Sequence, residues 1–243
     1  MIHLRNINKS FSENNVLKNI TLNINDNECV AIIGKSGSGK SVLLKHIIGL
    51  MKPDSGDVII NDQNINSISF KELQRLRGSI GMVFQFGALF DSMTVEENIR
   101  LALDKFSNLS KDLIKEKIIN VLKSVDMEGT ENLMPSELSG GMKKRVGIAR
   151  AIALSPKYLL YDEPTTGLDP IMTNSINCLI KKIHNAGNIT SIIVTHELRT
   201  VYDVVDRVIM LNQREIIFDD MPSKLINSKE EIVQQFILNK KAI

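Results

Sequence analysis

The sequence has little cysteine and no strong excess of charge. Its cysteines are Cys29 and Cys178, and tryptophan is absent from the 243 residues. Both cysteines stand inside apolar patterns, so we expect reduced thiols in the core and neither a disulfide framework nor a zinc site. The net charge of +2 gives no electrostatic support for binding to nucleic acid.

Long hydrophobic runs are missing as well. Apolar stretches such as residues 29–33 are far shorter than the roughly 20 residues that a membrane-spanning helix needs. The first residues, MIHLRN, lack a basic segment followed by an apolar one, so we expect no secretion signal. These absences favour a protein that stays in the cytosol, with enough length for one large α/β domain or for a core with a helical insert.

Short apolar runs of strand length recur along the chain, and helical patterns separate several of them. Alternating residues at 20–24, preceded by Leu4 and Ile7, predict an antiparallel edge, and residues 214–218 predict a late hairpin strand. Continuous apolar runs stand at 29–33, 58–60, 80–84, 158–161, 192–194 and 208–211. The sequence therefore predicts an α/β fold with a mostly parallel sheet and an antiparallel β edge.

A long stretch in the middle of the chain has no strand-like run. Between Phe84 and Tyr158 the patterns at residues 95–103, 113–125 and 142–154 are helical. We therefore expect one domain over residues 1–243, with a helical subdomain inserted at residues 86–156. Residues 221–243 are expected to form a helical tail, which Leu225, Ile232, Phe236 and Ile237 make amphipathic.

A complete phosphate-loop pattern follows the first buried run. Residues 34–41 read GKSGSGKS, between the strand expected at 29–33 and the helix expected at 40–50. The glycines let backbone N–H groups turn inward around phosphates, at the positive end of the helix. A P-loop NTPase core with a nucleotide site is thus predicted at Gly34, Lys35, Ser36, Gly37, Ser38, Gly39, Lys40 and Ser41. Lys40 would reach the β- and γ-phosphates, and Ser41 would bind Mg²⁺. The alternative for the whole motif is a glycine-rich turn that contains Lys-Ser by chance.

Two acids end the run at residues 158–161. Asp162 is expected at the carboxyl edge of the sheet, where ligands bind, and is a candidate Mg²⁺ ligand through water. Glu163 can accept a proton from the water that attacks the γ-phosphate. The alternative for this pair is two solvated carboxylates at the end of a strand.

A second anion site is predicted where residues 138–142, LSGGM, open a helix. Ser139 supplies a hydroxyl, and Gly140 and Gly141 expose backbone N–H groups at the helix start. One nucleotide needs one phosphate loop, so a second group of donors makes sense if it closes on a nucleotide held by another copy.

The order of these motifs resembles the ABC-type ATPase family over nearly the whole chain. TGLD at 166–169 and VTH at 194–196 complete that order. The resemblance implies that two copies pair head to tail and that each signature faces the ATP of the other copy. It also implies that the chain is an ATPase with ATP and Mg²⁺ as ligands.

The resemblance assigns four further residues. Gln85 is similar to the Q-loop residue that senses the γ-phosphate and ligates the metal, and Asp169 resembles the D-loop residue that contacts the partner copy. His196 resembles the switch histidine, which hydrogen-bonds the γ-phosphate. Phe11 is similar to the aromatic that stacks on adenine, and the alternative for it is a core aromatic of the first strand pair.

One departure points to a branch of the family. Position 142 is Met where the family usually has Gln, and Met is common in a branch that energises lipid transport with Mce proteins, the Mla type. Residues 41–45, 84–90 and 93–95, with Asn98, are also similar to that branch. We expect hydrolysis to survive the change, because Ser139–Gly141 is intact.

The resemblance implies a subunit that powers phospholipid or related lipid transport through a separate permease. The expected partners are a second copy, membrane permease subunits and an Mce-type lipid-binding protein, at the inner face of the cytoplasmic membrane. An importer of amino acids or another small solute is the alternative, and a non-transport ABC protein acting on nucleic acid is disfavoured by the charge. The tail either packs on its own domain or takes part in dimerisation.

Overall fold

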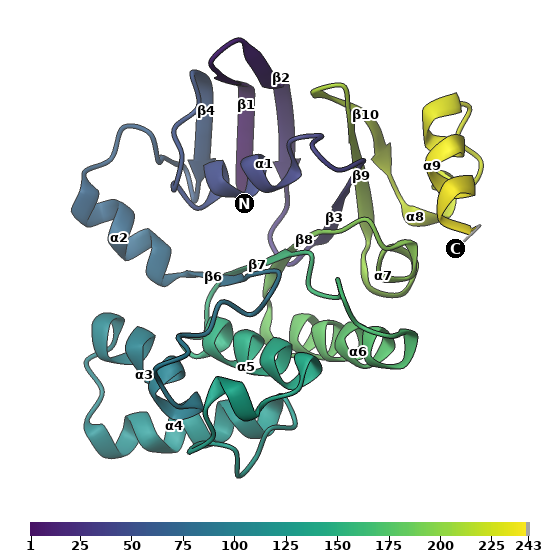
Figure 1. The fold of residues 1–243 in the computed structure, drawn as a ribbon. Coiled ribbons are helices and arrows are strands. Elements are labelled where there is room, and N and C mark those ends of the chain that lie inside the picture. Colours follow the sequence, from purple (N-terminus) through teal and green to yellow (C-terminus); the bar gives the residue numbers. More distant parts are fainter. Residues whose placement is uncertain (242–243) are drawn as a thin grey trace. The chain divides into compact units, whose positions relative to one another are not determined.

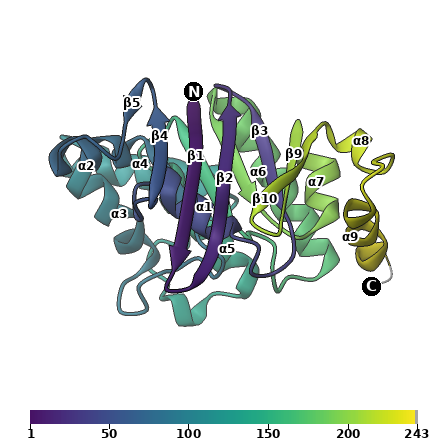
Figure 2. The ribbon, with the colours of Figure 1, turned by 90° about the horizontal axis from the view of Figure 1, so that it is seen from above.

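An antiparallel sheet begins the chain, which the computed structural model describes over residues 1–241. Strand β1 (Ile2–Phe11) pairs with β2 (Asn14–Ile24) and β4 (Ser55–Ile60), and β4 pairs with β5 (Gln63–Asn64). Figure 2 shows β1 and β2 side by side. Alternate side chains such as Leu4 are fully buried. The predicted antiparallel edge is confirmed.

Parallel strands carry the motifs. β3 (Cys29–Ile33) lies between β8 (Thr190–Val194) and β9 (Arg207–Asn212), parallel to both, and every side chain of β3 and β8 is buried. β10 (Glu215–Asp220) is antiparallel to β9, and separately β6 (Ile80–Val83) is parallel to β7 (Tyr158–Asp162). The fold class predicted from the sequence, α/β with mostly parallel pairing and an antiparallel edge, is confirmed.

Contacts divide the chain into two units. The first unit is Met1–Gln74 with Thr190–Ile243, and the second is Arg75–Ile189. The helices of the first unit are α1 (Lys40–Ile47), α7 (Leu198–Val204), α8 (Pro222–Leu225) and α9 (Glu231–Lys241), and α2 (Phe70–Gly78) spans the boundary in sequence. Helix α1 was predicted to reach residue 50 and ends at Ile47, because Gly49 takes a left-handed φ of 66°.

The second unit is mostly helical. It contains α3 (Val95–Phe106), α4 (Lys111–Ser124), the 3₁₀ turn η1 (Pro135–Glu137), α5 (Gly140–Ile152) and α6 (Pro170–Gly187). Helices α3, α4 and α5 pack on one another (Figure 1). The helices expected at 95–103, 113–125 and 142–154 are confirmed, and the bounds 86–156 of the helical insert stay a prediction. Among the described residues, no helix combines the length and apolarity that crossing a membrane requires.

One cysteine departs from its predicted place. Cys29 is buried in β3, and this burial raises the pKa of its thiol. Cys178 is exposed, so the expectation of a core thiol was wrong there. It follows the buried Asn177 on α6 but stands one turn after exposed Asn174, on the outward face.

The tail turns its apolar face inward within the described residues. Leu225 of α8 is fully buried, and Phe236 and Ile237 of α9 are nearly so, whereas Leu238 is exposed. This burial supports packing of the tail on its own chain, the first of the two alternatives.

Candidate functional site

The phosphate loop joins β3 to α1 in the first unit, and two of its glycines have no substitute. Gly34 has a φ of 150°, and a Cβ on it would lie 2.3 Å from the carbonyl oxygen of Leu211. Gly39 has a φ of 99° and serves as N-cap of α1, and its Cβ would lie 2.7 Å from Leu17. The loop therefore keeps backbone close to the helix start, which suits phosphate oxygens.

The loop also holds polar atoms suited to phosphate. Lys40 is buried, and its Nζ donates hydrogen bonds of 2.9 Å and 3.1 Å to the carbonyl oxygens of Gly34 and Lys35. Ser38 Oγ is buried and has no hydrogen-bond partner among the described residues. A Cβ on Gly34 would lie 2.7 Å from this Oγ, so the hydroxyl lies inside the loop. The buried Ser38 hydroxyl, which has no partner among the described residues, can donate a hydrogen bond to a phosphate oxygen. The Lys40 ammonium, which the loop's own carbonyl oxygens hold in place, supplies the positive charge that suits this anion.

His196 lies at the same edge of the first unit's parallel strands. Ile32 of β3 is paired with Val194 of β8, and Thr195 N–H donates to the Ile32 carbonyl oxygen at 3.2 Å. His196 therefore follows β8 at the level where the phosphate loop leaves β3. The half-buried ring is placed where a hydrogen bond to a phosphate can form.

Phe11 ends β1, and its ring is 44% exposed. This exposure excludes the alternative of a core aromatic. Lys9 Nζ lies 5.6 Å from the ring centroid and pairs with Asp54 at 2.5 Å. The exposed part of the ring can stack on a base.

In the second unit, Gln85 and Glu163 lie at one strand edge. β6 and β7 are parallel with Val83 opposite Tyr161, so the residues that follow the two strands leave at the same level. Glu163 has a left-handed φ of 51°, and Thr166 Oγ1 donates to its Oε2 at 3.1 Å. The carboxylate is thus oriented directly after Asp162, the last residue of β7.

The signature and the predicted D-loop residue both begin helices of the second unit. Ser139 is the N-cap of α5, and its Oγ accepts a 3.3 Å hydrogen bond from Met142 N–H. Asp169 is the exposed N-cap of α6 and accepts from the N–H groups of Ile171 and Met172 at 2.8 Å and 2.9 Å. The exposed Gly140 follows Ser139 at the helix start, as an anion site requires.

Three residues that the sequence did not single out as functional hold the segment after β6. Lys144 Nζ donates to the Gln85 carbonyl oxygen, and Arg150 donates to those of Gly87 and Ala88 at 2.8 Å and 2.7 Å. Fully buried Asn98 accepts from Phe90 N–H at 2.8 Å and donates to Phe90, Met93 and Thr94 carbonyl oxygens. A signal in the sequence could have indicated the burial of Lys144. This residue is three positions after Gly141 and four before Ile148, so it shares a helical face with these two buried residues.

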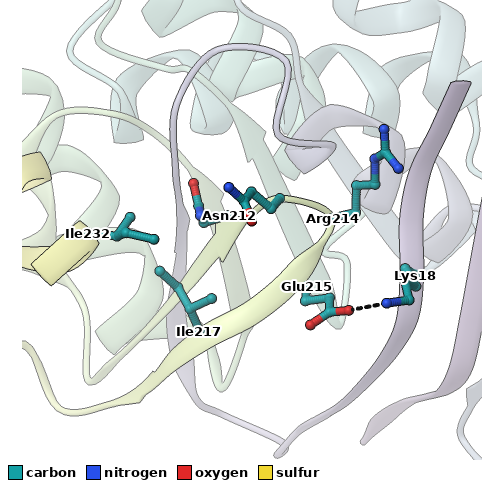
Figure 3. A pocket seen from close by; sticks show the side chains of 7 residues that line it. Lys18, Asn212, Arg214, Glu215, Ile217 and Ile232 are labelled. Atoms are coloured by element: carbon teal, nitrogen blue, oxygen red, sulfur yellow. Dashed lines mark hydrogen bonds and ion pairs between the residues drawn. The ribbon is translucent and has the colours of Figure 1, made fainter. Parts of the chain in front are cut away.

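A hollow in the first unit contains none of the predicted site residues. It measures about 560 Å³ and is lined by the turn between β9 and β10, by Ile217 of β10 and by Ile232 of α9. Figure 3 shows Lys18 and Glu215 facing one another within it, joined by an ion pair of 2.8 Å. Because Lys18 is already paired with Glu215 and no site residue lines the hollow, we assign it no ligand.

The predicted residues thus form two groups. The phosphate-binding group of the first unit comprises Phe11, residues 34–41 and His196. The hydrolytic group of the second unit comprises Gln85, residues 139–141, Asp162, Glu163 and Asp169. Within each group the strand register or a helix start accounts for the placement of most members, and the individual roles remain predictions.

Comparison with known proteins gives one consistent family. The family pattern described as "ABC transporter" matches residues 17–166. The TRIGALACTOSYLDIACYLGLYCEROL 3 protein of Arabidopsis thaliana is 41% identical, with 97% of this chain and 73% of that protein covered. The methionine import ATP-binding protein MetN of Legionella pneumophila (strain Paris) is 41% identical, with 98% and 69% covered.

Two further proteins complete the comparison. The intermembrane phospholipid transport system ATP-binding protein MlaF of Haemophilus influenzae is 35% identical, with 98% of this chain and 90% of that protein covered. The solved dimer of the ATP-binding cassette MJ0796, in a post-hydrolysis state bound to ADP and Pi, superposes with a TM-score of 0.84. It is 35% identical, and the match covers 91% of this chain and 99% of that one.

Proposed function

Since the chain belongs to the ABC transporter family, as an ATP-binding subunit that hydrolyses ATP, we propose that it powers lipid transport through a membrane permease. ATP is its nucleotide and Mg²⁺ the usual metal partner of the family. Two observations support the finer proposal. Met142 replaces the usual Gln of the signature, in which Ser139–Gly141 is intact. The phospholipid transport ATPase MlaF is similar over 98% of the chain.

The two groups of residues divide the chemistry. Lys40 and the loop N–H groups bind the phosphates, and the Ser38 hydroxyl acquires the partner that it lacks in the described chain. Glu163, held by Thr166, accepts the proton of the attacking water. His196 hydrogen-bonds the γ-phosphate, and Phe11 stacks on the base. Catalysis then depends mainly on position and charge.

The metal ligands that we propose are all oxygen donors. Ser41 supplies a hydroxyl, Gln85 an amide oxygen and Asp162 a carboxylate, which suits Mg²⁺. The bound ion would neutralise charge on the transferred phosphoryl group. The chain's own task is to hold these oxygens. Asp162 is the last residue of β7, and Gln85 follows the end of the paired strand β6 by two residues.

We propose that the permease docks on the segment from Gln85 to Met93. Phe86 is 74% exposed and Phe90 is 54% exposed, although the backbone beneath them is held by Lys144, Arg150 and Asn98. Aromatic side chains on a fixed backbone bind at low entropic cost and commonly anchor interfaces. The segment begins at the residue proposed to sense the γ-phosphate, so docking and hydrolysis share one piece of backbone.

Phe90→Asp is expected to detach the subunit from its permease and to leave ATP affinity within about 2-fold, because a buried unpaired charge is costly at an interface. Co-purification in mild detergent and an ATP titration measure the two effects. Phe70→Asp is the matched control, since Phe70 is 73% exposed and begins α2. Retention of the permease by Phe90→Asp would place the docking surface elsewhere.

The same purification tests the lipid. The wild-type complex is expected to contain an Mce-type protein, and solvent extraction followed by mass spectrometry should find phospholipid. A complex that instead contains a periplasmic amino-acid-binding protein would overturn the lipid assignment in favour of the importer alternative. The similarity of this chain to the methionine import ATP-binding protein MetN fits that alternative. The ATPase assignment stands in either case.

Ser139→Arg tests the proposed pairing of two copies. The bulky cation at the start of α5 would enter the partner's phosphate site, so ATP turnover should fall to background while ATP binding at the variant's own phosphate loop persists. Ser110→Arg controls for the lost cap, because Ser110 is the N-cap of α4 and accepts from Leu113 N–H. Normal turnover by Ser139→Arg would refute the two-copy arrangement.

A further inference from the structure

Lys144 is a buried cation in the middle of the signature helix. It is 4% exposed on α5, five residues after the serine that caps this helix. Burial lowers the pKa of its ammonium, and the nearby Glu163 raises it. A charged side chain in such a place costs stability unless polar groups compensate it. Its partners therefore indicate why a cation stands at this position.

The partners of Lys144 are backbone carbonyls at the ends of two neighbouring strands. Its Nζ donates to the carbonyl oxygen of Gln85, directly after Phe84 and the end of β6, and lies 3.4 Å from the carbonyl oxygen of Glu163, directly after β7. The ring of Phe86 covers it, with the centroid 5.9 Å from Nζ. One side chain thus connects the signature helix to the two residues that we propose to sense and to hydrolyse the γ-phosphate.

The backbone at Glu163 needs such support. A φ of 51° is uncommon for a residue with a long side chain, and such a strained backbone persists only where the surrounding structure holds it. The Glu163 carbonyl oxygen accepts from Thr166 N–H at 3.3 Å and from Lys144. Lys144 also faces this carbonyl with a positive charge, which Thr166 N–H does not provide.

Other contacts show that α5 and the segment after β6 fit closely together. A Cβ on Gly147 would lie 3.1 Å from Gly87 Cα, and a Cβ on Gly87 would lie 2.9 Å from the Lys143 carbonyl oxygen. Six residues after Lys144 on the same helix, Arg150 donates its two hydrogen bonds to the carbonyl oxygens of Gly87 and Ala88. We therefore expect a shift of α5 to move the backbone at residues 85–88 with it.

We propose that Lys144 is a positioning residue for ATP hydrolysis, which holds the backbone of Glu163 and Gln85 against the signature helix. When the signature engages a nucleotide, α5 transmits its position through this ammonium to both strand ends. The proposal rests on the proposed roles of Glu163 and Gln85. Lys144 itself touches no reacting atom, since its hydrogen bonds go to main-chain carbonyls.

Lys144→Met tests this role with a side chain of similar length and no donor. We expect kcat to fall about 10- to 100-fold, the effect of a small misplacement of catalytic groups, with KM for ATP within about 3-fold. Lys144→Gln, which keeps a donor, should have an intermediate kcat. Lys123→Met on the exposed end of α4 is the matched control. A wild-type kcat in Lys144→Met would overturn the proposal.

A double-mutant cycle separates positioning from a merely structural role. If Lys144 acts through Glu163, adding Lys144→Met to Glu163→Gln should slow turnover by no more than about 3-fold beyond Glu163→Gln alone. Effects that multiply in full would show that Lys144 acts independently, which contradicts the proposal. Thermal unfolding of each variant, with ATP titration, identifies general loss of fold, in which case the cycle is run with Lys144→Gln.

Failure of the proposed base is distinguishable from failure of this inference. If Glu163→Gln alone retains normal turnover, Glu163 is not the base, and the cycle is measured with Gln85→Ala instead. In that case, non-additivity between Lys144→Met and Gln85→Ala supports a positioning role at the β6 end, and full additivity with Gln85→Ala overturns the inference.

Discussion

Glu163→Gln is expected to slow ATP hydrolysis about 10²- to 10⁴-fold, the usual loss for a missing general base. The amide has the size of the carboxylate, and its oxygen can still accept the 3.1 Å hydrogen bond from Thr166 Oγ1. The side chain should therefore stay in place and lose only its ability to take a proton. A steady-state assay of phosphate release measures the loss.

Binding distinguishes this effect from a damaged site. ATP and Mg²⁺ should bind to Glu163→Gln as to the wild type, because the change keeps the size of the side chain and alters neither the phosphate loop nor a proposed Mg²⁺ ligand. Glu128→Gln, an exposed glutamate of the second unit, is the control and should hydrolyse ATP normally. If Glu163→Gln turns over ATP at the wild-type rate, the proton acceptor is another group.

Lys40→Ala is expected to weaken ATP binding by about 100-fold or more. The Lys40 ammonium is the main point charge of the phosphate loop, and charge-assisted hydrogen bonds contribute about 1.5–3 kcal/mol each. In the structure Nζ donates to the carbonyl oxygens of Gly34 and Lys35. These bonds hold the ammonium inside the loop, in the place from which it can reach phosphate oxygens. Titration with a fluorescent ATP analogue measures the change.

Loss of the internal bonds must be separated from loss of the phosphate contact. The melting temperature of Lys40→Ala without nucleotide reports the first, and the additional shift produced by saturating MgATP reports the second. Lys45→Ala is the control, because Lys45 is exposed in the last turn of the same helix. Unchanged ATP affinity in Lys40→Ala would remove Lys40 from the proposed site.

The two large effects should differ in kind because Lys40 is proposed to bind the phosphates, whereas Glu163 is proposed to accept a proton from the attacking water. Loss of Lys40 removes affinity, whereas loss of Glu163 leaves affinity and removes turnover. We propose that turnover responds to partners through contacts within the second unit. Lys144 and Arg150 of α5 hold the segment that begins at Gln85, and this segment presents exposed Phe86 and Phe90.

The sequence by itself determined the local structure around each motif. The glycines of GKSGSGKS allow a turn with backbone in left-handed conformations, and the structure has Gly34, Gly37 and Gly39 at positive φ. Continuous apolar runs such as Cys29–Ile33 cannot face water on either side, so they form the buried parallel strands. The start of the signature helix was equally legible, since residues 138–142 were predicted to open a helix and Ser139 is its N-cap.

Tertiary structure alone decided which side chains meet or face solvent. Spacing placed Cys178 in an apolar pattern, but the packing leaves this residue exposed. Residue spacing also did not reveal that Lys144 is buried against the carbonyl oxygens of Gln85 and Glu163, which lie 59 and 19 residues away in sequence. Periodicity in the sequence indicates which side chains share one face of a helix or strand. Whether that face is buried also depends on the segment that packs against it, and that segment is often distant in the sequence.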